Sequence, residues 1–324
     1  MSLAINATTS SGIILATDSR QSYRNQKGQA RIGSDNASKL FQLSRRVGVA
    51  ITGIAFLPEG GVLKNVSNFI EEFKRKEEVE KMKVKEITER LHRFFNEKYD
   101  YRKPLEQLKT VIIKDLEKQG CKITEDFKEE KKGFLKFKFQ DPSGKEHPRV
   151  VGLERISLLI AGFNHDDSHE VYGCNIPGEI IKKRDSAQKG QEYGASWIGQ
   201  VDVTSRIVLG WDGRILTLPF VQNAISKSNQ QEIERQLRGL EYKISWGTMT
   251  LQDAIDFCVL AIKTTEAIQR FSDGVKMNPG DIPGVGGKID VAVITRDKGF
   301  VWIRKKNIII DEEEISIDNL PNLR

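Results

Sequence analysis

The chain begins Met1-Ser2-Leu3, and its second residue carries the chemistry that the rest of the sequence must position. A serine hydroxyl is a poor nucleophile unless a neighbouring base takes its proton. A residue at the start of a chain carries its own base, the α-amine, whose ordinary pKa of about 8 leaves a useful neutral fraction at physiological pH. Removal of Met1 is chemically expected because Ser2 is small. Once Met1 is removed, Ser2 could therefore act as a nucleophile with its own amine as base.

Three further sequence blocks follow Ser2 in a defined order. They are GIILATDSR at 12–20, SKLF at 38–41 and VGVAITG at 47–53. In content and order these blocks resemble the β-type subunits of the proteasome and their bacterial relatives, which are N-terminal nucleophile hydrolases. In that family the nucleophile precedes an aspartate by sixteen residues, which is the spacing from Ser2 to Asp18 here. Lys39 falls a few residues later than the family's lysine, which implies a longer loop after Arg20.

The resemblance implies a role for several residues of these blocks. Lys39 would lie near Ser2 as a fixed positive charge that lowers the proton affinity of the amine and the hydroxyl. Asp18 would be the buried partner that orients Lys39. The backbone N–H of Gly53 would stabilise the tetrahedral intermediate, because a glycine there lets a substrate approach closely. Arg20 is assigned together with Gly53 to oxyanion or substrate binding.

The later part of the resemblance concerns the surroundings of the amine. Ser196, in a Gly-Ala-Ser context, resembles the family's supporting serine near the nucleophile's amine. The family also places an aspartate–serine element before a Gly-Gly and a strand. Here Gly286-Gly287 precede a strand, the expected serine position is Val285, and Asp281 is the nearest acid, one residue from the expected offset. The candidate nucleophile is serine, whereas proteasome β subunits use threonine and other members of the superfamily use serine. The resemblance covers residues 2–75, 156–183, 194–196 and 249–304.

Hydrophobic periodicity predicts the elements that must position these residues. Runs of β-prone residues predict antiparallel strands, the first two pairs joined by short turns. Apolar residues at three- and four-residue steps predict amphipathic helices. Pro104 would start a helix near its first turn, and Thr250 would cap another. The predicted strands are 3–9, 13–18, 39–43, 47–52, 133–139, 156–163, 169–174, 178–183, 289–295 and 299–304, and the predicted helices are 62–73, 84–95, 105–116, 228–241 and 249–270.

The order of these elements is strands, helices, strands, helix and strands, which differs from the alternation of a doubly wound parallel sheet. The sequence therefore predicts an α+β fold with antiparallel sheets. The family resemblance implies a four-layer αββα sandwich, in which two sheets pack face to face with helices outside. We expect one domain over residues 1–324, with insertions at about 80–150 and 200–245, the first of them a long helical and hairpin segment.

Composition narrows the class of protein. No apolar run approaches the ~18 residues that a membrane span needs, and no signal peptide is apparent at the start of the chain. The three cysteines lie far apart and form no CxxC pair, which points to a reducing, cytoplasmic compartment. The net charge of +6 is spread along the chain. The densest basic and aromatic stretch, 129–138, is interpreted as an amphipathic hairpin, so no nucleic-acid partner is expected.

Two other motifs could suggest a ligand. His165 and His169 flank two aspartates and a serine, but they lie between two predicted strands, where a polar hairpin turn is expected, so no metal site is predicted. The glycine-rich segment 283–288 lacks both the earlier glycine and the following Ser or Thr of a phosphate-binding loop. No cofactor is therefore expected.

The resulting functional hypothesis is hydrolysis of peptide or amide bonds by a threonine- or serine-type N-terminal nucleophile hydrolase, with Ser2 as nucleophile. The resemblance also implies a peptide or protein substrate and a homo-oligomeric ring, and leaves an ATPase partner open. Two alternatives remain at this point. One is a non-catalytic assembly subunit, which would retain Met1, and the other is an amidase of the same fold that acts on small molecules.

Overall fold

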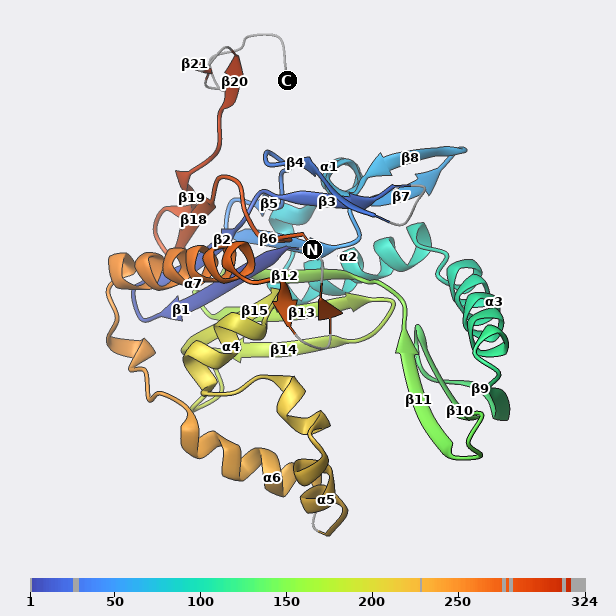
Figure 1. Cartoon of the computed structure of the whole chain (residues 1–324). Coiled ribbons are helices and arrows are strands. Elements are labelled where there is room, and N and C mark those ends of the chain that lie inside the picture. Colours follow the sequence, from blue (N-terminus) through green and yellow to red (C-terminus); the bar gives the residue numbers. More distant parts are fainter. Residues whose placement is uncertain are drawn as a thin grey trace.

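Two five-stranded antiparallel sheets form the centre of the protein (Figure 1). The computed structural model describes residues 2–25, 29–227, 229–275, 278–279, 282–310 and 313–315. The first sheet has the strand order β15-β1-β2-β18-β19, with bounds Gly194–Gly199, Leu3–Thr9, Gly12–Thr17, Asp290–Thr295 and Gly299–Arg304. The second has the order β14-β13-β12-β6-β5, with bounds Ile180–Asp185, His169–Ile176, Ile156–Phe163, Val47–Gly53 and Leu40–Ser44. The prediction of an α+β protein with antiparallel sheets is confirmed.

Burial explains why β1 and β2 form from nearly continuous apolar runs. Every residue of both strands is buried. A strand covered on both faces needs no alternation of polar and apolar residues. Along β1, Leu3 and Ile5 belong to a cluster shared with the long helix α7 (Leu251–Phe271), whereas Ala4 belongs to a cluster shared with the second sheet. These two strands therefore hold the start of the chain deep inside the protein.

Three hydrophobic clusters make up the core. One draws on both sheets, for example Leu15 of β2 and Leu159 of β12. A second covers the other face of the second sheet with helices α1 (Val66–Lys76) and α2 (Val84–Lys98). The third joins the first sheet to α7. Apolar side chains of both sheets therefore pack against helices as well as against each other.

Local capping chemistry sets where two of these helices begin. The Asn65 side chain accepts a hydrogen bond from the Ser67 N–H at the start of α1. Thr250 and Asp253 form a reciprocal capping box at the start of α7, as the predicted cap at Thr250 implies. A capping residue satisfies helical N–H groups that otherwise have no partner, so it fixes the first turn.

The remaining elements lie around the two sheets. Figure 1 shows α3 and the sheet β11-β10-β9 together at one side of the molecule. The remaining strands are β3 (Gln21–Arg24), β4 (Ala30–Ser34), β7 (Phe56–Glu59), β8 (Val62–Asn65), β9 (Lys122–Lys131), β10 (Phe134–Gln140), β11 (Glu146–Gly152), β16 (Gly274–Val275), β17 (Asn278–Pro279), β20 (Ile308–Ile310) and β21 (Glu313–Ile315). The remaining helices are α3 (Arg102–Lys118), α4 (Asp202–Leu209), α5 (Pro219–Lys227) and α6 (Gln230–Leu237), with short 3-10 helices at Val79–Lys81, Gly213–Thr217, Arg238–Leu240 and Trp246–Thr248.

The structure corrects one sequence prediction. Residues from Val62 were expected to start a helix, but β7 and β8 form a hairpin there and the helix begins at Val66. The first insertion is predicted from about residue 80, and within that segment Ile87 and Leu91 of α2 pack in the core against the second sheet.

Among the residues that the structure describes, no helix is both long enough and apolar enough to cross a bilayer.

Candidate active site

Ser2 lies immediately before β1, and its side chain is buried. Its carbonyl oxygen accepts a hydrogen bond of 2.7 Å from the N–H of Gln200, which follows β15. Ser2 lines a small pocket together with Lys39, Thr52 and Gly53. The structure thus brings the candidate nucleophile, the lysine and the glycine of the three sequence blocks to one place.

Asp18 follows β2 directly, and its carboxylate is fully buried. One oxygen, Oδ1, accepts hydrogen bonds from the backbone N–H of Leu3 at 3.0 Å and from Lys39 Nζ at 2.9 Å. The other, Oδ2, accepts from the N–H groups of Arg20 at 3.2 Å and Gly286 at 3.1 Å. Four donors from four parts of the chain therefore hold this carboxylate, and one of them belongs to the residue after Ser2.

Lys39 lies just before β5 and is buried in the same pocket. Its ammonium donates hydrogen bonds to the Asp18 carboxylate and to the carbonyl oxygen of Arg20. Burial lowers the pKa of Lys39 from its ordinary value, whereas the facing Asp18 carboxylate acts in the opposite direction. The positive charges of Lys306 and Arg20 lower this pKa further. Because of these opposed effects, the charge of Lys39 depends on its pairing with Asp18.

A second buried lysine–aspartate pair was missed by the sequence analysis. Lys306 donates from both its backbone N–H and its side chain to the buried carboxylate of Asp290, at the start of β18. The backbone distance to Asp290 Oδ1 is 2.8 Å. An aspartate between two apolar residues of a predicted strand was the only signal in the sequence. Neither Lys306 nor Asp290 lines the pocket of Ser2, so this is a buried ion pair outside the candidate site, with the Lys306 charge also acting on the pKa of Lys39.

Gly53 ends β6 in a backbone conformation that excludes other residues. Its φ is +93°, and a Cβ there would lie 1.8 Å from the carbonyl oxygen of Arg155. Gly199, at the end of β15, has the same φ of +93°, and its Cβ would lie 2.0 Å from the carbonyl oxygen of Ser2. Gly53 therefore allows a close approach to the Arg155 backbone, and Gly199 allows one to Ser2 itself.

Strand register separates Ser196 from Ser2. In the β1–β15 pair Ser196 lies opposite Asn6, whereas Leu3 lies opposite Gly199. At about 3.3 Å per residue, Ser196 is roughly 13 Å along the strand from Ser2. The register therefore does not support the prediction that Ser196 lies beside the Ser2 amine, and the residue of this segment that contacts Ser2 is Gln200, through the Ser2 carbonyl oxygen.

Gln200 belongs to a polar network that the sequence did not indicate. Gln269 of α7 donates to the side-chain oxygen of Gln200 at 3.3 Å. The side-chain oxygen of Gln269 also accepts hydrogen bonds of 2.9 Å from the N–H groups of Gly284 and Val285. The next residue, Gly286, donates a hydrogen bond to Asp18. The network therefore connects Gln200, which contacts Ser2, to the segment 284–286, which binds the Asp18 carboxylate.

Of the two remaining predicted site residues, the structure describes Arg20 but not Asp281. The Arg20 guanidinium makes a two-pronged ion pair with Asp35, at 2.6 and 3.0 Å, and lies against Gly286. Its side chain is not part of the lining of the Ser2 pocket. Its contacts with the site are its backbone N–H, which donates to Asp18, and its carbonyl oxygen, which accepts from Lys39. Asp281 lies outside the residues that the structure describes.

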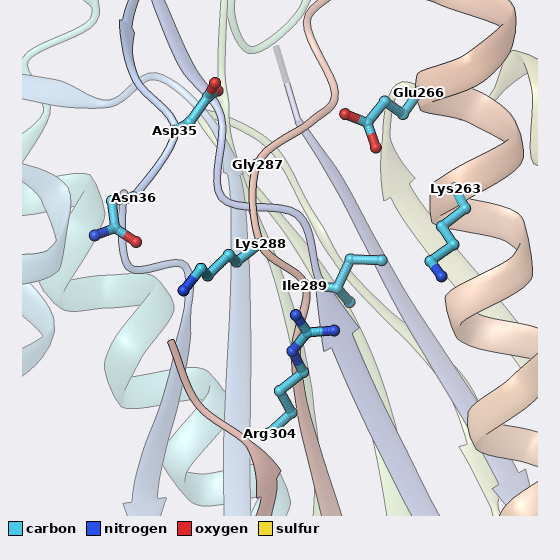
Figure 2. A pocket seen from close by; sticks show the side chains of 8 residues that line it. All are labelled: Asp35, Asn36, Lys263, Glu266, Gly287, Lys288, Ile289 and Arg304. Atoms are coloured by element: carbon cyan, nitrogen blue, oxygen red, sulfur yellow. The ribbon is translucent and has the colours of Figure 1, made fainter. Parts of the chain in front are cut away.

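A larger cleft of about 530 Å³ lies on another side of the same loop (Figure 2). Figure 2 shows Lys288 and Ile289 between the Asp35–Asn36 segment and the helix that carries Lys263 and Glu266. Among the residues that the structure describes, none of the predicted catalytic residues lines this cleft. The smaller pocket, which both Ser2 and Lys39 line, is therefore the candidate site.

The other candidate motifs lie elsewhere. His165 is exposed in the turn between β12 and β13, and the buried His169 has its Nε2 2.8 Å from the carbonyl oxygen of Glu192. No group of three or more potential metal ligands occurs among the described residues. Most of the basic stretch 129–138 lies in the hairpin β9–β10, where Lys136 pairs with Glu130.

Comparison with protein-family models and with curated proteins found no match for this chain. The family resemblance therefore rests on the residues and on their arrangement.

Proposed function

We propose that the protein hydrolyses peptide or amide bonds through an acyl-enzyme formed on Ser2. The observation that carries this proposal is the buried ion pair of Lys39 with Asp18, whose lysine lines the same pocket as Ser2. A buried ion pair is weak support for stability, because removing two charges from water costs as much as their attraction provides. Its position beside a candidate nucleophile is better explained by chemistry.

The reaction follows from general acid–base principles. After removal of Met1, the neutral α-amine of Ser2 takes the hydroxyl proton while Oγ attacks the carbonyl carbon of the substrate. The Lys39 charge and backbone N–H groups near Gly53 would stabilise the negative oxygen of the tetrahedral intermediate. The protonated amine then returns its proton to the leaving nitrogen as the C–N bond breaks. A water molecule hydrolyses the resulting ester by the same steps.

The proposal includes the finer architecture. The clusters of the core, one between the sheets and one under the helices on each outer face, support a four-layer αββα sandwich. In such an arrangement Ser2 would lie at the edge of the inner layers. The proposal also includes a peptide or protein substrate and a ring of identical subunits. Contacts around a ring are head-to-tail, so they need two complementary surfaces on each subunit.

An intact-mass measurement tests the proposed function. The protein, expressed from its own start codon, is incubated with a β-lactone that acylates N-terminal nucleophiles, and Ser2→Ala is treated identically. Loss of Met1 with one adduct on Ser2, absent from the variant, is the expected result. Retained Met1 without an adduct would refute the proposal and favour the assembly subunit. Cleavage of small acylated amides without cleavage of unstructured peptides would restrict the activity to small molecules.

A further inference from the structure

Thr52 lies one residue before Gly53 in β6 and lines the pocket of Ser2 and Lys39. Its side chain is 3% exposed. Its hydroxyl oxygen is fully buried and has no hydrogen-bond partner among the residues that the structure describes. Strand alternation places Thr52 on the same face of β6 as Ala50, which packs between the two sheets. The hydroxyl group is therefore on the side of the sheet that faces Ser2.

Gly199 shows how close Thr52 and Ser2 are. A Cβ built on Gly199 would lie 2.0 Å from the carbonyl oxygen of Ser2 and 3.1 Å from Cγ2 of Thr52. The Thr52 side chain and the Ser2 backbone therefore flank the same point at the end of β15, although they belong to different sheets.

The unpaired hydroxyl has an energetic consequence. A buried polar group without a hydrogen bond destabilises a fold by about 1–3 kcal/mol. Valine has nearly the same volume and would fill the position without that penalty. Local features that conflict with stability are concentrated at functional sites. The position of Thr52 beside the candidate nucleophile makes function the better explanation for its hydroxyl.

We infer that Thr52 is a positioning residue, whose hydroxyl oxygen accepts a hydrogen bond from the α-amine that removal of Met1 releases at Ser2. The inference rests on the proposed function. A buried amine brings new N–H donors into the pocket, and such donors need acceptors. A bond from one N–H to Thr52 restricts rotation of the amine, which leaves its lone pair free to take the proton of the Ser2 hydroxyl. Thr52 acts through Ser2 and does not itself react.

Loss of the Thr52 hydroxyl should change the pH dependence of acylation. A hydrogen bond that the protonated amine donates stabilises the charged form and raises its pKa. Removal of the acceptor should lower the pKa of the amine, so the acid side of the pH–rate profile should move to lower pH. It should also slow acylation at its optimum, by about tenfold for the loss of one hydrogen bond.

The test compares Thr52→Val, Thr52→Ser and Thr204→Val. Thr204 is fully buried in α4 and its hydroxyl also has no partner among the described residues, but it does not line the pocket. The rate of β-lactone acylation is measured against pH, together with the thermal unfolding temperature. We expect Thr52→Val to be slower, shifted to lower pH and at least as stable as the wild type. Thr52→Ser should restore the rate and the profile, and Thr204→Val should behave as the wild type.

The outcomes separate this inference from the proposed function. A reactive wild type with an unchanged Thr52→Val variant would overturn the inference and leave the function standing. A slow Thr52→Val variant with no pH shift and no rescue by Thr52→Ser would indicate packing alone and would also overturn it. A wild type that forms no adduct on Ser2 would overturn both.

Discussion

Lys39 Nζ lies 2.9 Å from Asp18 Oδ1, and both groups are buried within the protein. The same carboxylate oxygen accepts the N–H of Leu3, the residue next to Ser2. The ion pair is thus attached directly to the backbone that carries the candidate nucleophile. This relationship links the charge of the lysine to the position of Ser2, and it determines what substitutions at these residues should do.

Replacement of Lys39 and replacement of Lys306 should have similar effects on stability but different effects on activity. Lys39→Met and Lys306→Met each leave a buried aspartate without its cation, so each should lower the free energy of unfolding by about 3–5 kcal/mol. Only Lys39 lines the pocket of Ser2. Lys39→Met should reduce acylation by a β-lactone about 100-fold or more, whereas Lys306→Met should retain most of it. Urea unfolding and adduct formation on folded protein give the two quantities, and equal acylation by both variants would contradict a catalytic role for Lys39.

A methyl group at Gly199 should disturb Ser2. Gly199→Ala would place a Cβ 2.0 Å from the carbonyl oxygen of Ser2 in a backbone with φ of +93°. We expect a loss of about 3 kcal/mol in the free energy of unfolding and a marked loss of acylation. Gly60→Ala is the matched control, because φ is +61° there and nothing lies within 4 Å of the added atom. That variant should lose only about 1 kcal/mol and keep its activity. Chemical denaturation of both variants provides the comparison.

His169 should make stability depend on pH below neutrality. Burial lowers the pKa of His169, and Arg296 lowers it further, against the opposing effects of the Glu192 carbonyl and of Asp185. In the unfolded chain this histidine takes up a proton near pH 6.5, so between that pH and its lower folded pKa the unfolded state binds more protons. The free energy of unfolding should therefore fall as pH decreases through this window, by at most about 1.4 kcal/mol per pH unit. Urea unfolding of His169→Gln should show a weaker fall, and an identical pH dependence would contradict the prediction.

The three cysteines should differ in reactivity. Cys174 lies in the cluster under α1 and α2, and Cys258 lies in the cluster under α7. Burial raises the pKa of Cys174 to about 12 and also raises the pKa of Cys258, so neither forms the reactive thiolate at pH 8. Cys121 is partly exposed. Iodoacetamide should modify Cys121 alone in the native protein and all three after unfolding, as peptide mass spectrometry would reveal. Fast modification of Cys174 in the native state would contradict the burial of its side chain in the core.

Much of the local structure could be predicted from the residues alone. The apolar runs 156–163 and 299–304 coincide with β12 and β19, and Thr250 caps α7 as its sequence context indicates. These features depend on interactions within a few residues, so periodicity and capping are enough to predict them. The pairing of Asp18 with Lys39 was also expected, although only from a resemblance to a known family.

Tertiary structure decided what surrounds Ser2. Strand register places Gln200 beside Ser2 and moves Ser196 about four residues away, and no local pattern specifies which residues of two distant strands lie opposite each other. The same holds for the unpaired hydroxyl of Thr52 and for the pair of Lys306 with Asp290, which arise only when separate segments pack together. The sequence therefore determined which groups are available for chemistry, whereas the packing of two sheets determined which of them meet.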